Sequence, residues 1–290
     1  MKIVQSDEIE SSKASLHREG AAYRKLLLEG EAGIDNFSLV ISRSEARFSP
    51  RHRHTFEQFR YQLEGTADYS KTGTLEAGML GYFPEAVHYG PQTQVDKKDL
   101  TVLCLQCGGA SGDGYIGRGE QLEAAKELQS MGTFKDGVFH RNPDLPGKRN
   151  VEGSRAIWEH IKQRPLEYSE PRYETPFLMK PDNFDWRPVK GVGGVYEKHM
   201  GVFTERNSAS GFVKLDSDIS YNLGTDGRDI YFVLKGAGTA IGEPYRWGTT
   251  FYLEPNEVIA LTAVDETEMI HFRLPELDDL KAREMVAELS

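Results

Sequence analysis

Short β-rich runs separated by turn residues occur in two blocks along the chain, and they constrain its fold more than any other feature. In the first block, "FSLVISRSEARF", "FEQFRYQLEG", "GMLGYFPE" and "LTVLCLQC" alternate with Gly, Pro, Asn and Asp, which is typical of an all-β sandwich or barrel. The second block repeats the first. "DIYFVLKG" overlays "QFRYQLEG" when Gly65 meets Gly236, an offset of 236 − 65 = 171, and Pro84 and Pro255 differ by the same 171. We therefore expect two copies of one β fold.

The segments around these blocks predict the domain boundaries. We expect an N-terminal arm over residues 1–36, in which only "AAYRKLLLEGE" is helical in pattern, and a first β domain over 37–117. A helical linker over 118–170 follows, because "GEQLEAAKELQSMG" and "SRAIWEHIKQR" have helical spacing. A second β domain over 171–275 and a C-terminal helix over 276–290 complete the prediction.

Charge and hydropathy narrow the class of partner. The net charge is −10 and no run of Lys or Arg is long enough to follow a phosphate backbone, so we expect no nucleic acid or membrane partner and favour a small molecule. No apolar run approaches the roughly 18 residues of a membrane span, and "MKIVQSDEIESS" lacks the apolar core of a secretory signal. We expect a cytoplasmic protein. Cys104 and Cys107 should face opposite sides of one strand and remain reduced.

The run "SPRHRHTFEQFRYQLEG" places two of the eight histidines one residue apart on a predicted strand. Residues of equal parity share one face of a strand, so His52, His54, Gln58, Arg60 and Gln62 should project to the same side. Such a row of polar side chains is costly to bury unless a bound partner satisfies it.

A third histidine follows the next predicted turn. "AGMLGYFPEAVHYGP" could fold back and bring His88 toward His52 and His54. Three neutral imidazoles suit Fe, Ni, Cu, Mn or Zn and leave coordination positions for substrate or oxygen. The sequence therefore predicts a metal centre inside the first β domain.

These residues resemble the two motifs of the cupin superfamily. The first motif normally reads HxH, three or four residues, Glu, six residues, Gly, and the second reads Gly, five residues, PxG, two residues, His. Here Gln58 stands at the Glu position with Glu57 beside it, and "PEAVH" lacks the inner Gly and is one residue short. The resemblance implies tandem cupin barrels, which are double-stranded β-helices of the jelly-roll type. It also implies a metal bound by His52, His54 and His88, with Gln58 as a fourth ligand or as a group that orients the ligands.

The first motif is similar in spacing to that of gentisate and salicylate type dioxygenases, and the wider stretch to bacterial cupin proteins of undefined activity. This resemblance implies a mononuclear non-haem metal enzyme of the oxygenase type, with Fe(II) favoured over Mn, Ni, Zn or Cu, acting on a small carboxylated or enolic compound. Arg60 would pair with a substrate carboxylate or form a structural ion pair, for instance with Glu57. Gln62 would orient the substrate, and Tyr82 is a candidate acid or base.

Two other functions stay open at this point. One is a metal-dependent isomerase, lyase or decarboxylase, because a fold does not determine its chemistry. The other is a non-enzymatic cupin that binds a small ligand. Since cupins often pair through their sheet edges, a homodimer is also expected.

The second copy lacks the histidines. At an offset of 171, the three positions are taken by Leu223, Thr225 and Ile259, and only Asp229, opposite Gln58, could act as a ligand. We expect a degenerate second cupin.

Overall fold

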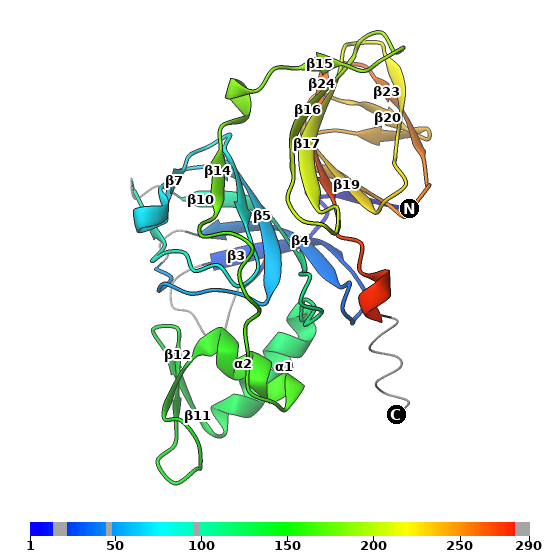
Figure 1. Cartoon of the computed structure of the whole chain (residues 1–290). Coiled ribbons are helices and arrows are strands. Elements are labelled where there is room, and N and C mark those ends of the chain that lie inside the picture. The colour runs from blue at the N-terminus through cyan, green and yellow to red at the C-terminus, as the bar shows by residue number, and fades with distance from the viewer. Residues whose placement is uncertain (14–21, 45–47, 96–98, 282–290) are drawn as a thin grey trace. The chain divides into compact units, whose positions relative to one another are not determined.

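The computed structural model describes residues 1–13, 22–44, 48–95 and 99–281, which form two compact units. The N-terminal unit contains residues 11–178, and the C-terminal unit contains residues 1–10 together with residues 179–290. Each unit is built around a seven-stranded antiparallel sheet (Figure 1). No helix in the described part of the chain is long and apolar enough to cross a membrane.

The large sheet of the N-terminal unit has the strand order β14-β8-β5-β10-β4-β3-β2. Its strands are β14 (Phe177–Met179), β8 (Leu80–Phe83), β5 (Phe56–Glu64), β10 (Leu100–Gly108), β4 (Phe37–Ser44), β3 (Ala22–Glu29) and β2 (Ser12–Lys13). A second sheet of the order β7-β6-β9 contains β7 (Thr74–Leu75), β6 (Ala67–Asp68) and β9 (Thr93–Gln94), with a short 3-10 helix at Ser70–Thr72.

Two helices and a small sheet follow this barrel in the chain. Helix α1 (Arg118–Gln129) precedes and helix α2 (Gly153–Lys162) follows a three-stranded sheet in the sequence. Its strands are β11 (Gly132–Lys135), β12 (Val138–Arg141) and β13 (Asn150–Glu152). The helices lie side by side (Figure 1), and their apolar faces share a core with this sheet. The members of that core include Ala124, Leu128, Phe139, Val151 and Ile157.

The large sheet of the C-terminal unit has the order β1-β22-β19-β24-β17-β16-β15. Its strands are β1 (Lys2–Gln5), β22 (Thr249–Leu253), β19 (Asp229–Lys235), β24 (Thr267–Arg273), β17 (Ala209–Leu215), β16 (Val195–Val202) and β15 (Arg187–Pro188). A four-stranded sheet contains β18 (Ser220–Leu223), β23 (Ile259–Ala263), β20 (Gly238–Ala240) and β21 (Glu243–Tyr245), and a 3-10 helix spans Pro181–Asn183.

The structure confirms that the two units repeat one fold. Strands β5 and β19 occupy the same place in their sheets, and each ends at a glycine with positive φ, Gly65 (φ 73°) and Gly236 (φ 87°). The next turn also begins alike, with Gly78 (φ 84°) and Gly248 (φ 83°). Glycine occurs at these turns because positive φ is strained for residues with a Cβ atom.

One secondary-structure prediction is wrong. The segment "AAYRKLLLEGE" contains the strand β3 instead of a helix, and this strand pairs antiparallel with β4. Ala, Leu, Lys and Glu favour helices locally, but pairing with the sheet outweighs that weak preference. The two helices predicted between 118 and 170 are present.

The two compact units also take in the segments that were predicted as an arm and a linker. Residues 1–10 belong to the C-terminal unit, and the segment 118–170 is part of the N-terminal unit. Of the predicted C-terminal helix, residues 278–281 are helical and residues 282–290 lie outside the described part of the chain. Cys104 and Cys107 are buried and are not disulfide-bonded.

Candidate functional site in the N-terminal barrel

A cavity of about 120 Å³ lies against one face of the large sheet of the N-terminal unit. Antiparallel register explains which side chains line it, because directly paired residues project to the same face. Arg24 of β3 pairs with Ser42, Ser42 with Val102, and Val102 with Gln62. Further along the strands, Cys104 pairs with both Val40 and Arg60, and Gln106 pairs with Gln58. All of these residues line the cavity, so Gln58, Arg60 and Gln62 share a face as predicted.

Arg60 is held by a set of neutral oxygen acceptors. Its Nε and Nη2 both donate to Gln58 Oε1, at 3.0 and 2.7 Å, and Nη2 also donates to Tyr89 Oη at 3.0 Å. Its Nη1 donates to Tyr69 Oη at 2.9 Å and to Gln92 Oε1 at 3.2 Å. These five bonds match the five N–H donors of a guanidinium group. Among the described residues Arg60 therefore makes no ion pair with Glu57 or another carboxylate, and its pairing with a substrate carboxylate stays a prediction.

The charge of Arg60 is buried without a carboxylate beside it. The residue is 6% exposed, and its guanidinium carbon lies 4.5 Å from the ring centre of Phe83 and 5.2 Å from that of Tyr89. Burial acts to lower the pKa of Arg60, but the nearby Tyr69 and Tyr89 outweigh this effect and the pKa is raised. The side chain is thus a permanent cation at the floor of the cavity.

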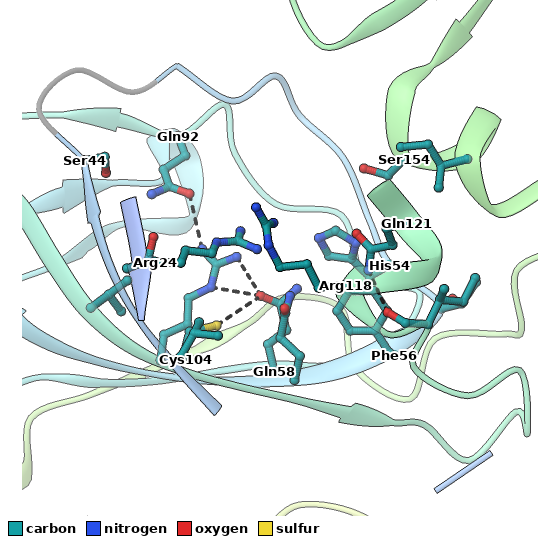
Figure 2. Close-up of a pocket in the computed structure, with 18 of the residues that line it drawn as sticks. Arg24, Ser44, His54, Phe56, Gln58, Gln92, Cys104, Arg118, Gln121 and Ser154 are labelled. Carbon is teal, nitrogen blue, oxygen red and sulfur yellow. Dashed lines mark hydrogen bonds between the residues drawn. The ribbon is translucent and has the colours of Figure 1, made fainter. Parts of the chain in front are cut away.

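Two further arginines line the cavity, one from strand β3 of the large sheet and one from the start of helix α1 (Figure 2). Arg24 lies on β3, and Glu29 at the end of the same strand accepts a hydrogen bond from the backbone N–H of Arg118 at 3.0 Å. This bond satisfies one N–H at the first turn of α1 and places Arg118 close to Arg24. Burial, followed by the charge of Arg24, lowers the pKa of Arg118. The two guanidinium groups therefore repel each other across the cavity.

Several buried polar atoms around the cavity have no protein partner. Arg24 Nε, Ser42 Oγ and Trp158 Nε1 are inaccessible to solvent and make no hydrogen bond to any described residue. Buried donors without an acceptor are uncommon in native proteins. Among the described residues that line the cavity there is no Asp or Glu, so the surroundings favour a ligand that carries acceptor atoms and negative charge.

The helices supply the apolar part of the cavity. Leu122 and Ala125 of α1 and Ile157 and Trp158 of α2 line it, together with Phe56 of β5. These apolar side chains lie beside three polar helix residues that also line the cavity, Arg118, Gln121 and Ser154. A void of about 150 Å³ accommodates benzene in an engineered protein, so a volume of about 120 Å³ suits a ligand of one small ring or branched chain.

The structure brings two of the predicted metal ligands together. The ring centres of His52 and His54 are 4.9 Å apart, and His54 lines the cavity, where it stacks on Phe56 at 4.5 Å. His52 is buried, and its Nδ1 lies 2.6 Å from the carbonyl oxygen of Pro50. Gln58 is also buried in this region.

His88 is not brought to the other histidines. Its side chain is largely exposed. The part of the side chain that is buried, followed by the charges of Arg53 and Arg51, lowers the pKa of His88. The neighbouring Tyr89 points inward instead, with its ring 4.6 Å from that of His52. Tyr89 stands five residues after Pro84, where the full cupin motif has its histidine. The shortened spacing "PEAVH" thus turns His88 outward, because adjacent residues of an extended chain face opposite sides.

The other predicted residues divide between the two faces of the sheet. Gln62 lines the cavity, and its Nε2 donates to the carbonyl oxygens of Glu64 at 2.6 Å and Thr101 at 3.3 Å. Tyr82 pairs with Phe59 on the opposite face and does not line the cavity. Burial, followed by the nearby Glu57, raises the pKa of Tyr82. This placement gives Tyr82 no contact with a ligand of the cavity, and it also directs Glu57 away from it.

The donor set does not fit a cupin metal centre. Among the described residues, no group of three or more His, Cys, Asp or Glu side chains could hold a metal ion. Gln58 Oε1 and Tyr89 Oη, the groups at the positions of the usual Glu and third His, both accept hydrogen bonds from Arg60. A metal ion at this point would compete for those oxygens with a guanidinium and would be repelled by its charge.

Comparison with solved structures identifies the fold. A candidate dioxygenase from Nostoc punctiforme superposes with a TM-score of 0.64 at 9% identity, covering 95% of this chain and 83% of its own. The protein GK1651 of Geobacillus kaustophilus gives 0.55 at 14% identity, covering 94% and 95%. A mutant of the oxalate decarboxylase of Bacillus subtilis gives 0.54 at 13% identity, covering 94% and 77%. No family model matches the sequence, and no curated protein matches it.

These likenesses define the class of protein. The chain has the fold of a two-cupin protein, with two antiparallel barrels in tandem, as the sequence motifs predicted. At 9 to 14% identity, the likenesses show the fold alone. The function of this chain has to be argued from its own cavities.

Proposed function

We propose that the N-terminal cupin binds a small carboxylic acid with an apolar body. The observation that carries this proposal is the lining of the cavity, which contains Arg24, Arg60 and Arg118 and no acidic residue among those described. A carboxylate is the acceptor that a guanidinium pairs with best. The apolar side chains that the helices contribute to the cavity would then cover the remainder of the ligand.

Within this proposal the three arginines have different roles. The donors of Arg60 are already bonded to neutral oxygens, so it supplies positive charge without a direct clamp. Arg24 has a buried Nε with no hydrogen-bond partner among the described residues, so it donates to the ligand. An anion between Arg24 and Arg118 would also relieve the repulsion between them.

Calorimetric titration of the full chain with matched pairs of ligands tests the proposal. The acids are benzoate and isobutyrate, and their neutral counterparts are benzyl alcohol and isobutanol. We expect at least one of the acids to bind and the alcohols to bind at least tenfold more weakly. Arg24→Met should weaken binding of the acid by about 10-fold to 100-fold, because a hydrogen bond to a charged group contributes about 1.5 to 3 kcal/mol.

Arg43→Met is the matched control. Arg43 lies on β4 in the same sheet, is 60% exposed, pairs with Asp99 and does not line the cavity. Its loss should leave the affinity for the acids unchanged. The proposal fails if the alcohols bind as well as the acids, if neither acid binds, or if the two arginine variants behave alike.

A second candidate retains the metal that the motif implies. One observation favours it: His52 Nδ1 lies 2.6 Å from the Pro50 carbonyl oxygen, an arrangement that puts the proton on Nδ1 and leaves Nε2 able to bind a metal. In this candidate the protein is a metal-dependent enzyme of the oxygenase type, with Fe(II) as its metal, acting on the same carboxylated class of compound.

Metal analysis separates the two candidates. Protein purified without a metal-affinity resin is measured by mass spectrometry before and after incubation with Fe(II), beside a His54→Ala variant. We expect well under one equivalent of transition metal in both proteins. One equivalent of Fe, Mn, Ni, Zn or Cu in the wild type that disappears in His54→Ala would favour the enzyme instead.

A further inference from the structure

The C-terminal unit contains a larger cavity, of about 550 Å³, which the degenerate motif gives no reason to expect. It is lined by residues of β16, β17, β18, β19 and β24. The apolar core of this unit adjoins the cavity, because Val213, Leu223 and Tyr231 belong to both. That core includes Val213, Val233, Leu253, Leu261 and Met269.

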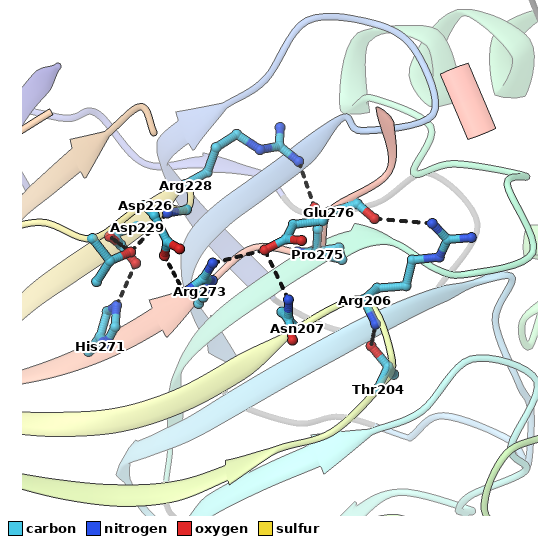
Figure 3. A network of polar contacts seen from close by, with 12 residues as sticks. Thr204, Arg206, Asn207, Asp226, Arg228, Asp229, His271, Arg273, Pro275 and Glu276 are labelled. Atoms are coloured by element: carbon cyan, nitrogen blue, oxygen red, sulfur yellow. Dashed lines mark hydrogen bonds and ion pairs between the residues drawn. The ribbon is translucent and has the colours of Figure 1, made fainter. Parts of the chain in front are cut away.

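An imidazole oriented by a buried carboxylate lies at this cavity. His271 Nε2 is 2.8 Å from Asp229 Oδ1, and Thr225 Oγ1 donates to Asp229 Oδ2 at 2.6 Å (Figure 3). Asp229 is fully buried, whereas the side chain of His271 is 21% exposed and lines the cavity. A carboxylate beside Nε2 fixes the proton on that nitrogen in the neutral ring, so Nδ1 becomes a hydrogen-bond acceptor.

The ring of His271 is also fixed by stacking. It lies nearly parallel to the ring of Tyr231, with centres 4.4 Å apart and an interplanar angle of 8°. The register places Gly211 directly opposite His271 on the next strand. An added Cβ at Gly211 would lie 2.5 Å from the carbonyl oxygen of Lys198, so glycine at this position allows β16 to approach closely.

Two acids, Glu197 and Asp226, and two bases, Lys198 and Arg273, line this cavity, so its charges balance when the histidines are counted as neutral. Asp226 Oδ1 is 2.9 Å from Arg273 Nη1, and Glu197 Oε2 is 3.4 Å from His199 Nε2. The carboxylate of Asp229 is buried beside His271 and does not line the cavity. The remaining cation is Lys198, whose Nζ donates to the carbonyl oxygen of Pro181 at 3.0 Å and lies over the ring of Trp186. Unlike the arginine-rich cavity of the N-terminal unit, this cavity has no excess of either charge among its described residues.

Its remaining polar groups include both donors and acceptors. Burial raises the pKa of Tyr231 and of Tyr221, so both phenols keep their protons at neutral pH. Asn207 and Asn222 add amide groups to the lining. A ligand with several hydroxyl groups can both donate to His271 Nδ1 and accept from the phenols and amides.

We propose that the cavity of the C-terminal cupin is a second ligand site, which binds a neutral polyhydroxylated compound such as a sugar or cyclitol, with a ligand hydroxyl donating to His271 Nδ1. The Asp229 carboxylate acts as a positioning group, because it sets the tautomer and the orientation of the imidazole. The inference does not depend on the carboxylate site of the N-terminal unit.

Saturation-transfer NMR on the full chain tests this site with defined probes. The neutral probes are D-glucose, D-xylose and myo-inositol, and the charged comparisons are ethanolamine and glycolate. We expect saturable binding of at least one neutral probe in the millimolar range. His271→Phe, which keeps an aromatic ring for stacking, and Asp229→Asn should each weaken that binding at least tenfold.

His160→Gln is the matched control, because His160 Nε2 also lies beside a carboxylate, Glu127 Oε2 at 2.6 Å, but outside this cavity. Its affinity for the neutral probe should equal that of the wild type. Circular dichroism establishes whether each variant is folded. If His271→Phe and Asp229→Asn both unfold, hydrogen exchange of the wild type decides, since bound probe should protect peptides of β19 and β24.

Three results would overturn the inference. The first is that none of the neutral probes binds. The second is that binding is unchanged in both folded variants, or that a bound probe protects peptides elsewhere. The third is that ethanolamine or glycolate binds at this cavity more tightly than every neutral probe.

Discussion

Replacing Arg60 with methionine tests whether this residue stabilises the N-terminal barrel or clamps a ligand. In the structure, the guanidinium group makes five hydrogen bonds to four neutral oxygens. Methionine preserves much of the apolar stem but leaves those acceptors without their donor. If Arg60 is mainly structural, the variant should lose stability before it loses anything else.

The expected size of the loss follows from opposing contributions. Five hydrogen bonds from a charged donor, at about 1.5 kcal/mol each, sum to about 7.5 kcal/mol. Removing a buried ion returns several kcal/mol of desolvation free energy, so we expect a net loss of about 3 to 4 kcal/mol. For a unit of this length, that corresponds to a fall in Tm of about 6 to 16 °C.

The assay must distinguish the two units of the chain. Hydrogen exchange in increasing urea, read separately on peptides of β5 and β10 and on peptides of β19 and β24, gives the free energy of unfolding of each unit. Arg60→Met should destabilise β5 and β10 and leave β19 and β24 unchanged, and Arg43→Met should change neither by more than about 0.5 kcal/mol. The structural role would be refuted, and the clamp favoured, if β5 is as stable in Arg60→Met as in Arg43→Met while Arg60→Met loses its affinity for benzoate.

Two further predictions concern turns and pH. Gly65→Ala should lower the free energy of unfolding by well over 1 kcal/mol, because Gly65 has φ 73° and an added Cβ would lie 2.5 Å from the Asp99 carbonyl oxygen. Gly78 has φ 84° but open space around an added Cβ, so Gly78→Ala should cost only the backbone strain of about 1 kcal/mol. Urea midpoints that show equal losses would contradict this argument. Burial raises the pKa of Glu85 in the folded state, so its contribution to stability is present below the unfolded pKa and is lost as pH rises through the folded one. Glu85→Gln should therefore gain stability relative to the wild type between pH 5 and pH 8 in urea titrations, and a wild type that is more stable at pH 8 would mean that the contact with Arg172 dominates.

Features set by local geometry could be predicted from the sequence. The alternation of β5 placed Gln58, Arg60 and Gln62 on one face, and the structure has them lining one cavity. Gly65 and Gly236 revealed the repeat because both turns require positive φ. These properties depend on a few consecutive residues and not on what packs against them.

The two arginines that line the cavity together with Arg60 could not be found in this way. Arg24 lies in a segment whose composition favours a helix, and only pairing with β4 makes it a strand. Arg118 reaches the cavity because Glu29, far away in the sequence, bonds to the first turn of α1. Both positions depend on tertiary contacts, for which a single sequence has no local signal.

The third ligand position did leave a signal. The full cupin motif has its histidine five residues after the proline, and counting from Pro84 reaches Tyr89 instead of His88. The departure from the motif was visible, but its consequence depends on the alternation of faces. Tyr89 points into the barrel, and its hydroxyl accepts a hydrogen bond from Arg60.

Comparison of equivalent positions shows how the two barrels differ in charge. In the N-terminal sheet Arg60 pairs with Cys104, and in the C-terminal sheet Tyr231 pairs with His271 at the corresponding place. The oxygens around Arg60 surround a cation as metal ligands would, so strand β5 itself places a positive charge where the sequence motif implied a metal ion. In the C-terminal barrel the position equivalent to Gln58 holds the buried acid Asp229, and Tyr231 stands in place of the cation Arg60. One fold thereby provides an anion-attracting cavity in one unit and an electrically balanced cavity in the other.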